Sequence, residues 1–98
     1  MDKNITKLIE YPEKGIISKT LFKSKSVDAT LFCMAKGVDM SEHTSTRQAI
    51  VYVVEGDGIF NLEGKKIEMK PGVIINMKEN AIHSLKANKN TSFILILV

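Results

Sequence analysis

The residues of this sequence best suited to chemistry are its two histidines, His43 and His83, and its single arginine, Arg47. Neutral imidazoles bind metal ions, and near neutral pH they also act as acids or bases. Two neighbouring imidazoles would titrate in a coupled way and could serve as hydrogen-bond partners for an anionic ligand. Arg47 could pair with a carboxylate through two hydrogen bonds, although a solvated loop cation is the simpler interpretation.

Short strands separated by turns must position these side chains. Apolar and polar residues alternate over residues 27–35, and the more apolar face, which includes Leu31 and Cys33, is expected to point inward. Residues 49–54 are apolar at every position, which predicts a strand buried on both faces. Further strands are predicted over residues 59–63, 66–70, 73–77, 82–87 and 91–98, and weaker ones over residues 5–9 and 15–22.

The regular spacing of the turns predicts an all-β fold. Turn signals at Glu55-Gly56-Asp57-Gly58, Gly64 and Pro71-Gly72 separate short strands, about nine in all, without a convincing helix. This pattern is typical of a sandwich or barrel, here a small double-stranded β-barrel of two facing antiparallel sheets. The positions expected to face inward are Val51, Val53, Phe60, Leu62, Ile75 and Leu85.

Composition limits the remaining possibilities. A chain of 98 residues forms one domain, and its single cysteine excludes an internal disulfide or a Cys-rich zinc module. The sequence has neither an apolar run of ~20 residues nor a secretory signal, so we expect a cytoplasmic protein that does not enter membranes. The formal net charge is +3, and the fourteen basic residues are dispersed, which argues against nucleic acid as a partner.

The spacing of glycines and histidines resembles the two motifs of the cupin family. Five residues separate Gly37 from His43, and Gly56 falls where the first motif, G-x5-H-x-H-x3-E-x6-G, ends. Gly72 and His83 have the separation of the second motif, G-x5-P-x-G-x2-H-x3-N. The resemblance implies a jelly-roll barrel that is one cupin domain over residues 1–98, with N-terminal strands in residues 1–26 and the conserved core in residues 27–98.

The resemblance implies a metal site that is incomplete here. Metal-dependent cupins bind the ion through three histidines and a glutamate, but Ser45 and Ala49 occupy two of those positions, leaving His43 and His83. The resemblance places both at the barrel mouth, with ring nitrogens within roughly 3–6 Å of each other if both bind one Zn, Fe, Mn or Ni ion. A further ligand would come from Gln48, Cys33, Asn76, Met77, Met34 or Glu42. Cys33 is equally a small buried hydrophobe, and Glu42 should point away from its neighbour His43.

Three functions remain open at this point. The first is binding of a small molecule in the barrel pocket, with a weakly bound divalent metal as a possible addition. The second is a metal-dependent isomerase, dioxygenase or decarboxylase acting on a small organic acid, and the third is a non-catalytic dimeric module. The expected pocket residues are His43, His83, Arg47, Gln48, Phe60, Met77 and Leu85.

A homodimer is expected from the apolar surface that one barrel leaves uncovered. Ile50, Tyr52 and Val54 form a second apolar face on a strand whose first face fills the core. In cupins this outer face commonly meets another subunit, and an N-terminal strand, here residues 5–9, commonly joins the neighbour's sheet. The alternative is that the chain's own N-terminal segment covers this face.

Overall fold

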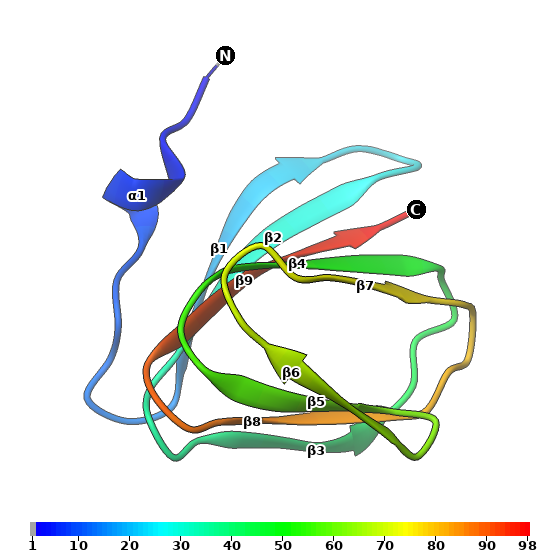
Figure 1. Cartoon of the computed structure of the whole chain (residues 1–98). Coiled ribbons are helices and arrows are strands. Elements are labelled where there is room, and N and C mark those ends of the chain that lie inside the picture. The colour runs from blue at the N-terminus through cyan, green and yellow to red at the C-terminus, as the bar shows by residue number, and fades with distance from the viewer. Residues whose placement is uncertain (1) are drawn as a thin grey trace.

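The computed structural model describes residues 2–98 and is built almost entirely from strands (Figure 1). In chain order the elements are α1 (Ile5–Leu8), β1 (Ile16–Lys23), β2 (Asp28–Met34), β3 (Asp39–His43), β4 (Ala49–Glu55), β5 (Gly58–Leu62), β6 (Lys65–Met69), β7 (Ile74–Met77), β8 (His83–Ala87) and β9 (Thr91–Leu97). The single helix of the described residues has four residues, and none there is long and apolar enough to cross a membrane.

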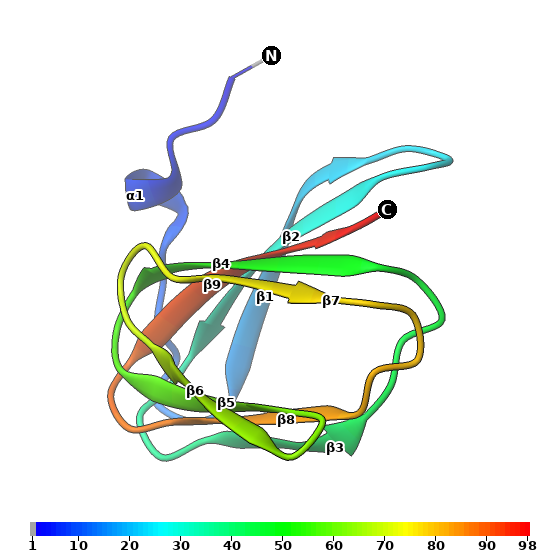
Figure 2. The ribbon, with the colours of Figure 1, turned by 45° about the vertical axis from the view of Figure 1, so that its right-hand side comes forward.

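The strands form two antiparallel sheets that face each other. One sheet has the order β1-β2-β9-β4-β7 and the other the order β3-β8-β5-β6. Turned by 45°, the ribbon shows the two sheets enclosing a barrel, with α1 outside it (Figure 2). The predicted fold class, a small barrel of two facing antiparallel sheets, is confirmed.

The core lies between the sheets and follows the period-two pattern of the strands. Val51 and Val53 of β4, Phe60 of β5, Ile75 of β7 and Leu85 of β8 are buried there, as expected. Leu62, the sixth residue expected to face inward, is only partly buried and packs against this core from the end of β5.

The N-terminal run over residues 5–9 is not a strand, contrary to the prediction. It forms α1, where Asn4 caps the helix by accepting a hydrogen bond from the backbone nitrogen of Thr6 at 3.0 Å. β1 lies at the edge of its sheet, and the N-terminal run does not pair with that edge. Local capping therefore outweighs the β-propensity of Ile5 and Ile9 in this chain.

β3 was not predicted, because its sequence, Asp39-Met40-Ser41-Glu42-His43, is mostly polar and lacks a strand pattern. The strand exists because its backbone pairs with β8, with Met40 opposite Leu85 and His43 opposite His83. The count of about nine strands is thus right, but β3 takes the place of the predicted strand at residues 5–9.

Two predictions about strand faces are also corrected. β4 is buried on one face only, since Ile50 and Tyr52 remain 36% and 39% exposed on the outside of the five-stranded sheet. In β2 it is Phe32 and Met34 that contact the barrel core, so Leu31 and Cys33 face outward. Cys33 is nevertheless fully buried, on the face of β2 that points away from the barrel core.

Candidate functional site

Two imidazoles lie face to edge at one end of the barrel. His43 ends β3 and His83 begins β8, and the two residues are opposite each other across the antiparallel pair. Their ring centroids are 4.1 Å apart with an interplanar angle of 61°. The structure thus brings together the two histidines that the motif spacing singled out. His83 is buried, whereas His43 is exposed and forms the solvent side of the pair.

The hydrogen bonds of both rings determine which nitrogen is left for a ligand. Nδ1 of His43 lies 2.7 Å from the carbonyl oxygen of Ser41, and Nδ1 of His83 lies 3.0 Å from that of Ala81. A carbonyl oxygen only accepts, so each Nδ1 carries the proton and donates it. In the neutral rings Nε2 is therefore the unprotonated nitrogen, with its lone pair available.

Burial keeps His83 neutral. Desolvation lowers the pKa of His83, the hydrogen bond to Ala81 partly offsets this effect, and the neighbouring His43 lowers it further. The ring of Phe60 lies parallel to that of His83, with centroids 5.8 Å apart and an interplanar angle of 2°. His83 is consequently a neutral ligand or hydrogen-bond acceptor at neutral pH rather than a cation.

The space beside the two rings is small and mostly apolar. This inner cavity has a volume of about 30 Å³ and is lined by Phe32, Met40, His43, Val51, Phe60, Met77, His83, Leu85, Phe93 and Leu95. A volume of roughly 10–15 Å³ admits one water, whereas organic ligands occupy pockets of about 300–1,000 Å³. The inner cavity therefore accommodates an ion or a water molecule but not an organic substrate.

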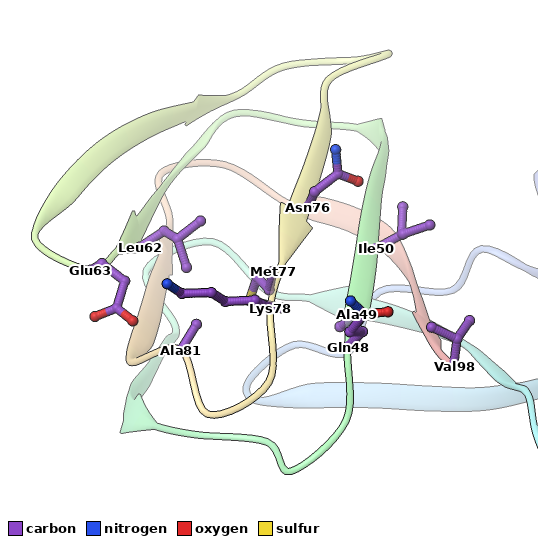
Figure 3. Close-up of a pocket in the computed structure, with 10 residues that line it drawn as sticks. All are labelled: Gln48, Ala49, Ile50, Leu62, Glu63, Asn76, Met77, Lys78, Ala81 and Val98. Carbon is purple, nitrogen blue, oxygen red and sulfur yellow. The ribbon is translucent and has the colours of Figure 1, made fainter.

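A larger hollow opens next to it at the barrel mouth. This mouth pocket has a volume of about 520 Å³ and is lined by Gln48, Ala49, Ile50, Leu62, Glu63, Asn76, Met77, Lys78, Ala81 and Val98 (Figure 3). Its walls come from the start of β4, the end of β7 and the turn after β5. Met77 lines both spaces.

The expected pocket residues divide between these two spaces. Phe60 and Leu85 line the inner cavity with the two histidines, Met77 lines both spaces, and Gln48 lines only the mouth pocket. The sequence could not separate the groups, because a strand pattern tells which residues face inward but not at which depth. Met40 also lines the inner cavity, although strand alternation alone would place a residue three positions before His43 on the opposite face.

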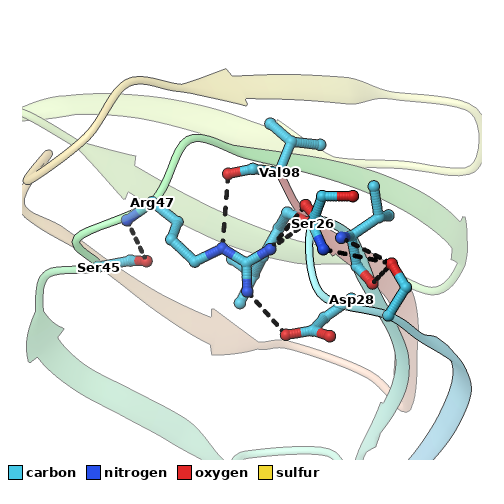
Figure 4. A network of polar contacts seen from close by, with 8 residues as sticks. Ser26, Asp28, Ser45, Arg47 and Val98 are labelled. Atoms are coloured by element: carbon cyan, nitrogen blue, oxygen red, sulfur yellow. Dashed lines mark hydrogen bonds and ion pairs between the residues drawn. The ribbon is translucent and has the colours of Figure 1, made fainter.

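Arg47 lies in neither space, which corrects its assignment to the pocket. Its guanidinium forms an ion pair with Asp28 at 2.8 Å and donates hydrogen bonds to the carbonyl oxygens of Ser26 at 2.9 Å and Leu97 at 3.1 Å (Figure 4). These partners lie at the beginning of β2 and the end of β9. Arg47 therefore links the beginning of β2 to the end of β9. Its guanidinium N–H groups already have these partners, so they do not form a free pair of donors for a carboxylate ligand.

The four-ligand divalent site of complete cupins does not fit these side chains. Within residues 2–98, no three His, Cys, Asp or Glu side chains gather to bind a metal. Among the candidate further ligands, Cys33 faces outward, Met34 is buried in the core, and Gln48 and Asn76 line the mouth pocket. Glu42 is exposed and lines a separate hollow that His83 also borders, but it does not line the inner cavity. Only Met77 shares the inner cavity with the histidines.

The comparisons with known proteins agree with this fold. The family model described as a cupin domain matches residues 30–98. A cupin superfamily protein from Desulfitobacterium hafniense is 22% identical with a TM-score of 0.90, and the match covers 96% of this chain and 86% of that chain. A cupin 2 conserved barrel domain protein from Leptotrichia buccalis is 29% identical with a TM-score of 0.90, over 98% of this chain and 47% of that chain. KdgF from a Halomonas species is 26% identical with a TM-score of 0.80, over 85% of this chain and 78% of that chain. No curated protein matches the sequence.

Proposed function

This chain belongs to the cupin family, and we propose that it binds a small organic molecule in the mouth pocket of its barrel. The observation that carries the proposal is the mouth pocket itself, whose volume of about 520 Å³ lies within the usual range for such ligands. Apolar side chains contribute to its lining, among them Leu62, Met77 and Ala81. A few polar groups then fix the orientation of the ligand.

The polar groups of the pocket favour a small organic acid. Gln48 and Asn76 supply amide donors and acceptors, and Lys78 supplies a cation. The ion pairs within residues 2–98 use Lys19, Arg47 and Lys70, so the charge of Lys78 remains available to a ligand. Glu63 also lines the pocket, on the side toward which Lys78 extends (Figure 3), so it disfavours a second anionic group there and suits a hydroxyl or ammonium group instead.

Charge reversal at Lys78 tests this proposal. The probes are monosaccharides, sugar acids, aromatic acids and amino acids, titrated into isotope-labelled protein while amide and methyl NMR signals are followed. We expect an acid to shift the signals of Ala49, Met77 and Ala81, and Lys78→Glu to weaken its binding by roughly tenfold or more, because a charge-assisted hydrogen bond is lost.

The control is Lys66→Glu, which makes the same charge change on the exposed β6 strand outside the pocket. Equal weakening by both variants would mean that only net charge matters. Shifts confined to other parts of the barrel, or no binding by any acid of the panel, would refute the mouth pocket as the site.

A metal-dependent reaction has less support than ligand binding. The two imidazoles are the only His, Cys, Asp or Glu side chains that line the inner cavity, and catalytic zinc or iron sites use three such ligands. A purely structural role does not account for the mouth pocket. Binding is therefore the function that the geometry favours.

We further propose that the protein is a homodimer formed through the outer face of the five-stranded sheet. Tyr52 of β4 lies between Ile74 of β7 and Ile94 of β9, and Ile50 lies beside Ile96. Tyr52 and Ile74 are 39% and 60% exposed, so the chain's own N-terminal segment does not cover them. Burying such side chains is worth about 1.5–3 kcal/mol each, and a second copy offers the same face to do so.

The change Tyr52→Lys should convert the dimer into a monomer, because it places a charge at the centre of this patch. Light scattering on material eluting from a sizing column at micromolar concentration gives the mass. Ile82→Lys is the matched control, since Ile82 is 46% exposed but directly precedes β8 of the opposite sheet, and it should leave the dimer intact. An unchanged protein with the mass of one chain at high concentration would refute the dimer.

A further inference from the structure

Two thioethers face the same inner cavity as the two imidazoles. Met40 is partly exposed on β3, and Met77 is buried on β7. Together with His43 and His83 they form what we call the soft-donor set: four uncharged side chains that can each donate one lone pair. Because the resemblance to complete cupins concerns histidines and a glutamate, neither methionine belongs to the inherited pattern.

The donors reach the cavity from both sheets. Met40 and His43 lie on β3, and the pairing of β3 with β8 is irregular between them, so two residues three positions apart can line the same cavity despite strand alternation. His83 enters from β8 of the same sheet, whereas Met77 enters from β7 of the opposite sheet. An ion between them would have donors on more than one side.

From this arrangement we infer that the inner cavity is a site for a soft monovalent cation, Cu(I), bound by Met40, His43, Met77 and His83. Thioether sulfur selects Cu(I) among the common biological metals, and imidazole binds it as well. The inference concerns a different space and a different ligand class from the organic molecule proposed for the mouth pocket, and it does not depend on that molecule.

Charge favours a monovalent ion over a divalent one. None of the four donors carries a negative charge: thioethers and imidazoles bind a cation through a neutral lone pair, and the Nδ1 hydrogen bonds leave Nε2 of each ring as the nitrogen that can do so. The cost of transferring an ion from water into an apolar site grows with the square of its charge, so a divalent ion costs roughly four times as much as a monovalent one. Without a carboxylate or thiolate around the cavity, nothing compensates the second charge.

Size and access agree with an ion. The volume of about 30 Å³ accommodates a dehydrated cation, and of the two histidines that line the cavity His43 is exposed to solvent and His83 is buried. The other buried methionines, Met34 and Met69, belong to the core without lining this cavity. They serve as internal controls for methionine chemistry in the same protein.

The test uses Ag(I) as a redox-inert probe and Cu(I) under anaerobic, reducing conditions. With the methionine methyl groups labelled by carbon-13, we expect both ions to shift the signals of Met40 and Met77, with saturation at one equivalent, and to leave those of Met34 and Met69 in place. Competition with a chromophoric Cu(I) chelator gives the affinity.

Substitution by leucine removes sulfur while roughly conserving volume. The double variant Met40→Leu/Met77→Leu should lose at least a hundredfold in Cu(I) affinity, whereas Met34→Leu/Met69→Leu should retain it. His43→Ala should lose it as well, because an imidazole ligand is gone. Circular dichroism confirms that each variant is folded.

Three results would overturn the inference: no binding of Ag(I) or Cu(I), binding that leaves the methyl signals of Met40 and Met77 unchanged, or equal loss of affinity in both leucine pairs. The Lys78→Glu experiment reports on the mouth pocket independently. Acids that bind while Ag(I) does not would refute the Cu(I) site alone, and Ag(I) binding without any acid binding would refute the mouth-pocket ligand alone.

Discussion

Replacing Gly56 by alanine should destabilise this protein more than any other single methyl addition at a turn. Gly56 has φ +115°, a conformation that residues with a side chain rarely adopt, and an added Cβ would lie 2.5 Å from the Cα atom of Thr91 and 2.6 Å from the carbonyl oxygen of Asn90. Both are backbone atoms, so the collision cannot be relieved by rotating a side chain. We expect a loss of roughly 3–5 kcal/mol from the combined strain and overpacking, a large part of the about 5–15 kcal/mol that stabilises an ordinary domain.

Gly64→Ala separates collision from backbone strain. Gly64 also has a positive φ of +80°, but an added Cβ would meet nothing within 4 Å. Urea unfolding followed by circular dichroism should therefore show a loss of only about 1 kcal/mol for Gly64→Ala. Equal losses in the two variants would mean that the contact between the Gly56 turn and Thr91 contributes nothing.

The same turn explains why the fold could be predicted from glycine spacing. Hydrogen bonds close this corner: the hydroxyl of Thr91 accepts one from the backbone nitrogen of Asp57 and donates to a carbonyl oxygen, and Asn88 donates to the carbonyl of Asp57. Gly37 and Gly72, the other motif glycines, also have positive φ values, of +85° and +90°. Such positions determine where the chain turns. Their spacing therefore indicates the barrel fold even in a sequence that lacks two of the four metal ligands of complete cupins.

The composition of the site was less predictable, because each misplaced residue depends on partners far along the chain. Arg47 contacts residues 19 and 50 positions away, and nothing near it in the sequence indicates Asp28 or Leu97 as partners. β3 is a strand because β8 pairs with it, although its own residues are polar. Met40 reaches the inner cavity only because the pairing of β3 is irregular, a feature without a local sequence signature.

Alternation also failed where both faces of a strand are covered. In β2, Leu31 and Cys33 are as well buried as Met34, although only Met34 packs in the barrel core. The hydrophobicity of a residue predicts that its side chain is buried, but it does not predict which part of the chain buries it. The placement of Cys33 away from the histidines followed only from the structure, in which Phe32 and Met34 are the residues of β2 that contact the barrel core.

Phe60→Ala should produce the largest loss among core substitutions. Phe60 is one of the largest fully buried side chains, lies opposite Leu85 and Ile67 in the four-stranded sheet, and stacks on His83. Truncating a buried phenylalanine costs about 3–5 kcal/mol, because both the transfer energy and the cavity left behind count. The matched control is Phe22→Ala in β1: Phe22 is 56% exposed, so its truncation should cost less than about 1 kcal/mol in the same urea experiment.

The milder change Phe60→Leu tests the link between this core residue and the histidine pair. Leucine keeps an apolar side chain in place but removes the ring that covers His83, so water gains access to the imidazole. Since desolvation is the main cause of the lowered pKa of His83, that pKa should rise toward the ordinary value of a histidine. An NMR titration of the imidazole signals measures the shift, with Phe22→Leu as the control. An unchanged pKa of His83 in a folded Phe60→Leu variant would show that Phe60 stabilises the barrel without controlling the site.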